Sequence, residues 1–189
     1  MNYISTRDKN LHMSAAQAIA GGLAPDGGLM TPERFPRLAP GDLARLSAMT
    51  YEQRAADIMK RFLDDFSEEE LLAYAHAAYG GGKFSSPDVA PVHQVDAHTY
   101  CLELWHGPTC AFKDMALQML PHLLTASLKK TDEDKTVCIL VATSGDTGKA
   151  ALEGFRDVPS TRILVFYPKD GVSQVQELQM VTQEGANVG

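Results

Sequence analysis

The stretch TVCILVATSGDTGKAALEGF, residues 136–155, decides the fold of this chain. Its first six residues are a β-branched apolar run, which is typical of a buried strand. Gly145 and Gly148 then allow a tight turn, and small and apolar residues recur behind them at helical spacing. The stretch therefore predicts a strand, a glycine-containing loop and a helix in that order, which is one unit of a parallel α/β sheet.

A loop of this kind, between a strand and a helix, is a natural anion site. Free backbone N–H groups converge there, at the positive end of the helix dipole. Ser144 and Thr147 add hydroxyl donors to the predicted site. An ordinary strand-to-helix turn, with Ser144 or Asp146 as the N-cap, fits the same residues equally well.

Strands and helices alternate on both sides of this stretch. Their order after residue 91 predicts a parallel sheet with crossover helices, and the last four residues resemble the start of a further strand. The predicted elements are strand 99–105 (buried), helix 114–128, strand 136–142, helix 147–156, strand 162–167 and helix 173–184. Pro121 does not fit a regular helix interior, so we expect a kink or a break there.

The first 90 residues show helical patterns instead. An alanine-rich helix is expected over 14–20, and two capping boxes, Thr50 with Gln53 and Ser67 with Glu70, predict helices over 51–65 and 68–79. The glycines that follow residue 79 open a loop, and we expect a domain boundary near residue 90. The sequence thus predicts a mainly helical region, 1–90, followed by a partial α/β domain, 91–189.

Lys113 is the strongest candidate for covalent chemistry. It follows the turn WHGPTC and opens the predicted helix, flanked by Phe112 and Met115. Apolar neighbours and the positive end of a helix both disfavour the ammonium form of a lysine. Such lysines form Schiff bases with carbonyl cofactors. A surface lysine that merely opens a helix is the alternative interpretation.

The loop at Gly148-Lys149 also resembles a nucleotide-binding P-loop. That motif needs a glycine five residues before its Gly-Lys and a Ser or Thr after the lysine. Here Thr143 and Ala150 occupy those two positions, which removes the sharp turn and the magnesium ligand. A P-loop-like nucleotide-binding protein therefore stays only as the alternative function.

Composition limits the remaining classes. Hydrophobic residues make up 44% of the chain and the formal charge is −7, which argues against general nucleic-acid or anionic-membrane binding. No apolar run approaches the length of a membrane span. The three cysteines have no CxxC spacing and suggest reduced thiols of the cytoplasm, and Cys110 is interpreted as a packing residue. The histidines have no metal-ligand spacing, so no metal site is expected.

Three motifs together resemble one known family. HGPTCAFKD (106–114), ATSGDTG (142–148) and VFYPKDGVSQVQELQM (165–180) are similar to the motifs of long-chain bacterial and fungal threonine synthases. YISTRD (3–8) and APDGGLMTP (24–32) fit the same family. These enzymes belong to fold-type II of the pyridoxal-phosphate enzymes, so the resemblance implies a lyase of threonine biosynthesis. Family members continue well beyond 189 residues, so we expect an incomplete enzyme, inactive as a 189-residue chain.

The resemblance also implies roles for individual residues. Lys113 would bind pyridoxal 5′-phosphate as a Schiff base and move protons of the substrate, O-phospho-L-homoserine. The family loop that faces the substrate carboxylate and the cofactor's 3′ oxygen corresponds to Ser144, Gly145, Asp146, Thr147 and Gly148. Asp146 would lie beside the cofactor, where related enzymes usually carry asparagine. Lys169 and Ser173 mark a second place where an anion of the substrate could bind, although solvated loop residues are an equal alternative. The role of His106 is left open.

Overall fold

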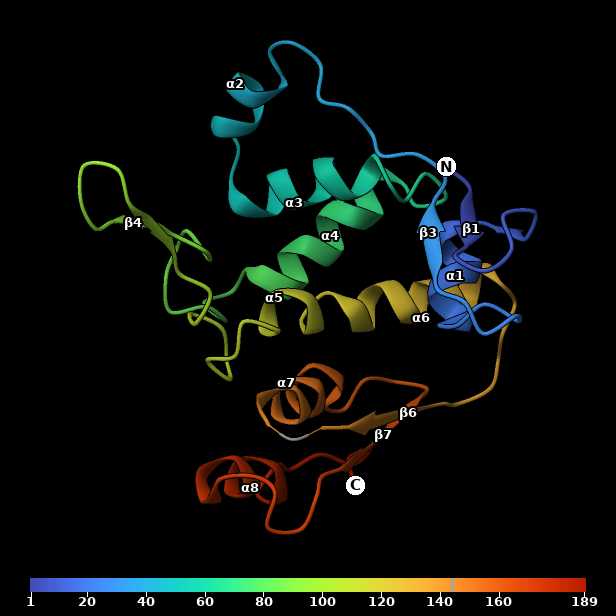
Figure 1. Ribbon diagram of the computed structural model, residues 1–189, viewed down its shortest axis with the longest axis vertical. Coiled ribbons are helices and arrows are strands. Elements are labelled where there is room, and N and C mark those ends of the chain that lie inside the picture. Colours follow the sequence, from blue (N-terminus) through green and yellow to red (C-terminus); the bar gives the residue numbers. More distant parts are fainter. Residues whose placement is uncertain (144) are drawn as a thin grey trace. The chain divides into compact units, whose positions relative to one another are not determined.

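The computed structural model describes residues 1–143 and 145–189 (Figure 1). These residues form two compact units. The first comprises Met1–Gly80 together with His122–Asp134, and the second comprises Gly81–Pro121 together with Lys135–Gly189. The chain therefore enters the second unit, returns to the first and enters the second again. The domain boundary near residue 90 remains a prediction, and the two compact units are not divided at that residue.

The first unit contains a small antiparallel sheet that the sequence pattern did not predict. Its strand order is β2-β1-β3, with Tyr3 opposite both Met13 and Pro32. The strands are β1 (Tyr3–Ser5), β2 (His12–Met13) and β3 (Met30–Pro32). Strands this short carry too few residues for an alternating pattern to stand out.

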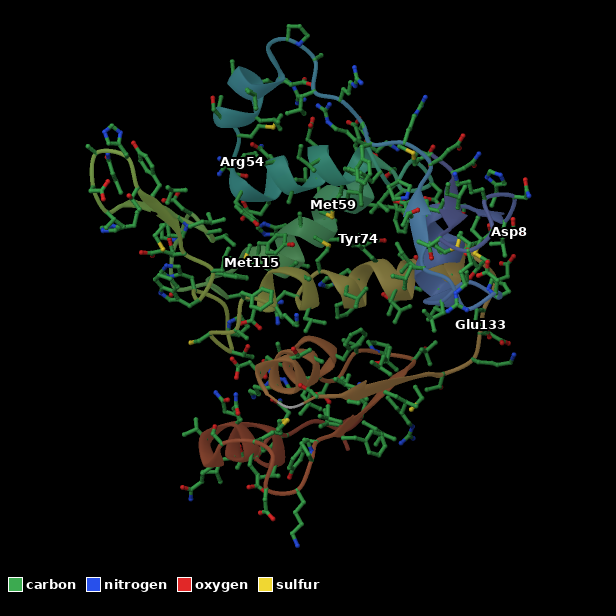
Figure 2. The ribbon with its side chains drawn as sticks, in the orientation of Figure 1. Asp8, Arg54, Met59, Tyr74, Met115 and Glu133 are labelled. Atoms are coloured by element: carbon green, nitrogen blue, oxygen red, sulfur yellow. The ribbon has the colours of Figure 1, made fainter. Side chains whose placement is uncertain are left out.

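The helices of the first unit begin where the capping boxes predict. Thr50 and Ser67 each accept a hydrogen bond from the backbone N–H three residues later, and the Gln53 and Glu70 side chains complete the boxes. The helices are α1 (Ala15–Gly21), α2 (Asp42–Ser47), α3 (Tyr51–Lys60) and α4 (Glu68–Tyr79). Helix α2 was not predicted. Tyr74 lies on α4 (Figure 2). Its ring stacks on that of His122, with centroids 6.0 Å apart.

The break expected at Pro121 is present. Helix α5 (Asp114–Leu117) ends after one turn, and α6 (Leu120–Lys130) begins one residue before the proline. Pro121 therefore lies in the first turn of α6, where a missing N–H has no intrahelical partner to lose. No helix in the described part of the chain is long and apolar enough to cross a membrane.

The second unit holds the predicted strand–helix–strand arrangement. Strands β6 (Val137–Ala142) and β7 (Thr161–Phe166) pair in parallel, and α7 (Asp146–Phe155) connects them. Val188 forms an isolated parallel bridge with Ile163, at the place where the sequence predicted the start of a further strand. Helix α8 (Gln174–Val181) follows β7. The buried face of α7 is apolar and consists of Ala150, Ala151, Leu152 and Phe155.

The strand predicted over 99–105 is present in part, but the prediction that it is buried was wrong. Strand β5 (Tyr100–Leu102) pairs antiparallel with β4 (Val92–Gln94), and every residue of both strands is exposed. Asp96 sets up this hairpin, because its carboxylate accepts the backbone N–H groups of His98 and Thr99. The carboxylate stabilises the turn locally, so strand pairing here does not require a covering layer.

Candidate active site

Lys113 begins helix α5, as the sequence predicts. It is the N-cap residue, its side chain is half-buried, and its Nζ lies 4.4 Å from the centroid of the Phe112 ring. The amine therefore stays accessible beside an aromatic face. Because α5 is a single turn, the helix dipole at Lys113 is weaker than the predicted long helix implied.

Asp114 holds the turn that presents this lysine. Its side chain is completely buried, and its two carboxylate oxygens accept the Thr109 backbone N–H at 2.8 Å and the Thr109 hydroxyl at 2.7 Å. Burial raises the pKa of Asp114, while the two hydrogen bonds from Thr109 oppose that rise. These two hydrogen bonds tie Asp114, directly after Lys113, to Thr109, four residues before Lys113, and so hold the turn between them.

Gly107 closes the other side of this turn. A Cβ built on Gly107 would lie 2.5 Å from both Cβ and Oδ2 of Asp114, so only glycine allows this approach. Cys110, interpreted from the sequence as a packing residue, is instead exposed and has a positive φ of 61°. That interpretation was wrong, because position 110 lies at the outer corner of the turn, where the chain reverses.

The predicted anion loop opens helix α7. Gly145 is its N-cap, and no described side chain caps the helix, so Asp146 does not act as the cap. The Thr143 hydroxyl instead accepts the Gly145 N–H at 3.2 Å. A Cβ on Gly148 would collide with Thr143 and Met180, at 2.6 and 2.8 Å. Ser144 lies outside the described residues, and Thr147 is half-buried in the first turn of α7.

The third sequence motif meets this loop through Gln176. Its Nε2 donates to Asp146 Oδ1 at 2.9 Å, and a Cβ on Gly145 would lie 3.0 Å from the same nitrogen. Ser173 is the N-cap of α8, and its hydroxyl accepts the Gln176 N–H at 3.3 Å. Lys169 is exposed in the loop between β7 and α8. The structure thus joins Asp146 to the start of α8, a contact that the sequence analysis did not anticipate.

The lysine turn and helix α7 pack within the same unit. A Cβ on Gly154 of α7 would lie 2.2 Å from the Leu117 carbonyl oxygen of α5. The charges of Glu153 and Lys149, which lie on α7, also act on the pKa of Asp114. Helix α5, which begins at Lys113, therefore packs against the same helix whose first turn forms the predicted anion loop.

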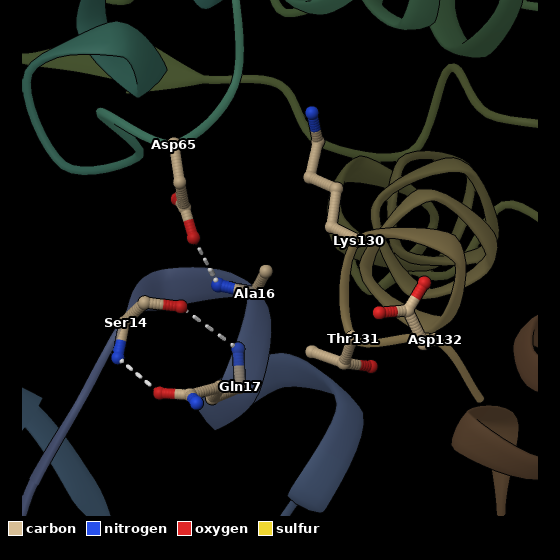
Figure 3. Close-up of a pocket in the computed structure, with 7 residues that line it drawn as sticks. All are labelled: Ser14, Ala16, Gln17, Asp65, Lys130, Thr131 and Asp132. Atoms are coloured by element: carbon tan, nitrogen blue, oxygen red, sulfur yellow. Dashed lines mark hydrogen bonds between the residues drawn. The ribbon is translucent and has the colours of Figure 1, made fainter.

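A polar cavity of about 550 Å³ lies in the first unit (Figure 3). It is lined by Ser14, Ala16, Gln17, Asp65, Lys130, Thr131 and Asp132. Asp65 accepts the Ala16 N–H at 2.7 Å, and the Lys130 ammonium pairs with Glu70 at 2.9 Å. The cavity contains none of the predicted site residues, and its main charged groups bind neighbours within the unit.

Comparisons with known proteins identify the family that these residues resemble. Residues 2–79 match the family model described as "Threonine synthase N terminus". The threonine synthase of Pseudomonas aeruginosa is 39% identical over 189 residues, which cover 100% of this chain and 39% of that protein. This chain matches the N-terminal part of threonine synthases.

Solved structures agree with the sequence comparison. The pyridoxal-phosphate-bound threonine synthase from Brucella melitensis superimposes with a TM-score of 0.90 at 35% identity, over 100% of this chain and 40% of that one. The yeast threonine synthase gives a TM-score of 0.89 at 33% identity. The predicted fold, the start of a fold-type II pyridoxal-phosphate enzyme, is confirmed. The chain spans about two-fifths of the length of these relatives.

Three polar residues of the second unit were missed or left without a role. The His106 ring nitrogens lie 2.8 Å from Ser85 Oγ and 2.7 Å from Glu103 Oε2. The spacing of three residues between Glu103 and His106 was the only local signal in the sequence. Ser85 gave no signal, because it is 21 residues away from His106.

Proposed function

We propose that this protein is a threonine synthase, which converts O-phospho-L-homoserine and water to L-threonine and phosphate. The observation that carries the proposal is the match of the whole chain, at a TM-score of 0.90, to a pyridoxal-phosphate-bound threonine synthase. The residues at the site support the proposal, because Lys113 is partly exposed and lies in a turn that is held in place by buried contacts of Asp114. We expect the enzyme to act in the cytoplasm, since its three thiols are free and exposed.

The residues of the second unit fit pyridoxal phosphate. The amine of Lys113 would hold it covalently, and Asp146, fixed by Gln176, would lie beside its ring oxygen. The cofactor supplies an electron sink for charge that develops on the substrate carbons. Lys113, once its amine is free, would move protons at those carbons. The N–H groups in the first turn of α7, which no described side chain caps, suit the substrate carboxylate.

Lys169 and Ser173 are proposed to contact the anionic part of the substrate. Both are exposed around the start of α8, and Gln176 links that start to Asp146. The Ser173 hydroxyl accepts the Gln176 N–H and donates its hydrogen to Gln176 Oε1 at 3.2 Å, so it would have to exchange that acceptor for an anion of the substrate. The small-molecule substrate needs no nucleic-acid or membrane partner, which agrees with the net charge of −7.

The alternative of a P-loop nucleotide site is not favoured by the contacts of Lys149. Its Nζ lies 3.7 Å from Glu153 on the same helix and also hydrogen-bonds the side chain of Gln183. A P-loop lysine instead reaches the β- and γ-phosphates of the nucleotide. Ala150, at the position of the magnesium ligand, is completely buried.

Borohydride reduction tests the assignment of Lys113. The protein expressed from its complete gene is loaded with pyridoxal phosphate, reduced, digested and mapped by mass spectrometry. We expect the added mass on Lys113, and we expect Lys113→Ala to lose both the label and phosphate release. Lys169→Ala, which changes an exposed lysine, is the matched control and should keep the label on Lys113. Recovery of the label on Lys149 or Lys169 in the unchanged protein would contradict the proposal.

A further inference from the structure

A chain of hydrogen bonds in the second unit ends on an exposed serine hydroxyl. The chain consists of Glu103, His106 and Ser85. His106 Nε2 lies 2.7 Å from Glu103 Oε2, and His106 Nδ1 lies 2.8 Å from Ser85 Oγ. The imidazole and the carboxylate are mostly buried, with side chains 17% and 22% exposed, whereas Ser85 is exposed. Only the hydroxyl is thus fully open to a ligand.

Backbone contacts fix all three members of this chain. The Ser85 N–H donates to the His106 carbonyl at 2.8 Å, and the Glu103 N–H donates to the Pro91 carbonyl at 2.9 Å. Phe84, directly before the serine, is 5% exposed. The three side chains therefore meet on backbone that is already held in place, which lowers the cost of organising them for a reaction.

The partners of His106 determine where its proton lies. An ionised carboxylate only accepts hydrogen bonds, so Glu103 requires a proton on Nε2. In the neutral imidazole Nδ1 is then an acceptor, and the Ser85 hydroxyl must donate its hydrogen to it. The lone pairs of Ser85 Oγ consequently face the solvent, polarised by the imidazole behind them. A hydroxyl, a base and a group that orients the base are the arrangement of an activated oxygen.

We propose that Glu103, His106 and Ser85 form a proton relay, and that Ser85 takes a proton from the water that adds to the substrate. The second half of this statement rests on the proposed function. Ser85 Oγ accepts a proton from the water while its own hydroxyl proton moves to His106 Nδ1. The hydroxide bonds to the substrate carbon, and the displaced electron pair passes to the electron sink that the bound cofactor would supply. The imidazolium stays paired with Glu103 until it passes the proton back through Ser85 to solvent water.

The position of the relay in the chain supports this role. Gly107 follows His106 and touches Asp114, which follows Lys113. His106 and Lys113 directly precede the two residues that approach each other. Each therefore lies one residue, about 3.8 Å along the backbone, from that contact. The same turn thus joins the histidine of the relay to the lysine proposed to hold the cofactor.

The protein contains its own reporter for the relay. Trp105 is the single tryptophan of the chain, and its ring stacks on that of His106 with centroids 5.7 Å apart. A change in the position of the imidazole should change the emission of the stacked indole. Glu103 and Ser85 contact the His106 ring nitrogens, so Glu103→Gln or Ser85→Ala should change the Trp105 emission if these contacts hold the ring in place.

A fluorophosphonate probe tests the relay without cofactor or turnover. Ser85 Oγ forms a bond to phosphorus, the P–F bond breaks, fluoride leaves and the hydroxyl proton passes to His106. We expect labelling at Ser85, slowed about 100-fold in His106→Ala and Glu103→Gln, the usual worth of a positioned general base. Ser86→Ala is the matched control, because Ser86 Oγ accepts the Asp88 N–H and is not a member of the relay. In this variant Ser85 should be labelled at the unchanged rate.

Two results would overturn the relay. The first is labelling of Ser85 no faster than that of other exposed serines, and the second is a rate unaffected by Glu103→Gln. The role in water addition is tested separately in the loaded protein, where Ser85→Ala should lower turnover about 100-fold and leave the Lys113 label intact. Loss of the Lys113 assignment with retained Ser85 labelling would remove the proposed function and leave the activated serine. Full turnover in Ser85→Ala would remove the role in water addition.

Discussion

Gly107→Ala is the sharpest test of how the turn holds Lys113. The new Cβ would lie 2.5 Å from Asp114 Cβ and Oδ2, whereas optimal contacts between carbon atoms are about 3.5–4.0 Å. Asp114 has no exposed surface into which it can move without leaving Thr109. If both hydrogen bonds are lost, at about 1.5–3 kcal/mol each for a charged acceptor, the cost is about 3–6 kcal/mol. Relaxation of the exposed outer part of the turn offsets some of this, so we expect about 3 kcal/mol.

The measurement is urea unfolding followed by the fluorescence of Trp105, two residues before the substitution. Gly21→Ala is the control, because a Cβ there meets nothing within 4 Å. We expect that control to change the free energy of unfolding by less than about 0.5 kcal/mol. Gly107→Ala should also lower borohydride labelling of Lys113. A variant as stable as the control, with full labelling, would show that the contact between Gly107 and Asp114 does not hold the turn.

Two further predictions concern the first unit. Ser67→Ala removes the N-cap hydroxyl of α4 and should lower the free energy of unfolding by about 1 kcal/mol, while Ser47→Ala, whose hydroxyl only donates within α2, should have little effect in the same urea titration. The hydrogen bond from Arg61, with that from the Ala39 N–H, lowers the pKa of Asp42 from 3.8 to about 2. Its stabilising contribution is therefore present above about pH 4 and lost as the pH falls toward 2. Asp42→Asn should flatten the stability curve in that window, and an unchanged acid limb would contradict this.

Local chemistry explains why many elements could be predicted. A capping box such as Thr50 with Gln53 uses residues three apart, so the sequence alone contains the whole interaction. The break near Pro121 follows from the missing N–H of one residue. The strand–helix–strand order around residues 137–166 follows from periodicity and connection length. In each case the decisive contact lies within a few residues of the signal.

Burial and distant pairing could not be predicted in the same way. Residues 100–102 have the composition of a buried strand, yet they form an exposed hairpin whose turn depends on the Asp96 side chain. The prediction gave strand type correctly, because β-branched and aromatic side chains favour extended backbone whether or not they are covered. The contact between Ser85 and His106 spans 21 residues and has no periodic signal. The same holds for Gln176 and Asp146, which are 30 residues apart.

The proposed chemistry and the stability of the second unit depend on the same contacts. Asp114 cannot act on a ligand itself, because it is completely buried, but it fixes the residue before it. Gly107 permits that burial and follows the histidine of the relay directly. A substitution at either position should therefore move Lys113 and His106 together, since the two lie on opposite arms of one turn. Substitutions of Ser85 or Glu103 remove functional groups while leaving the pair of Asp114 and Thr109 in place. Loss of Ser85 labelling with an unchanged free energy of unfolding is thus expected only from substitutions of Ser85 or Glu103. This difference separates residues that position the site from residues that act in it.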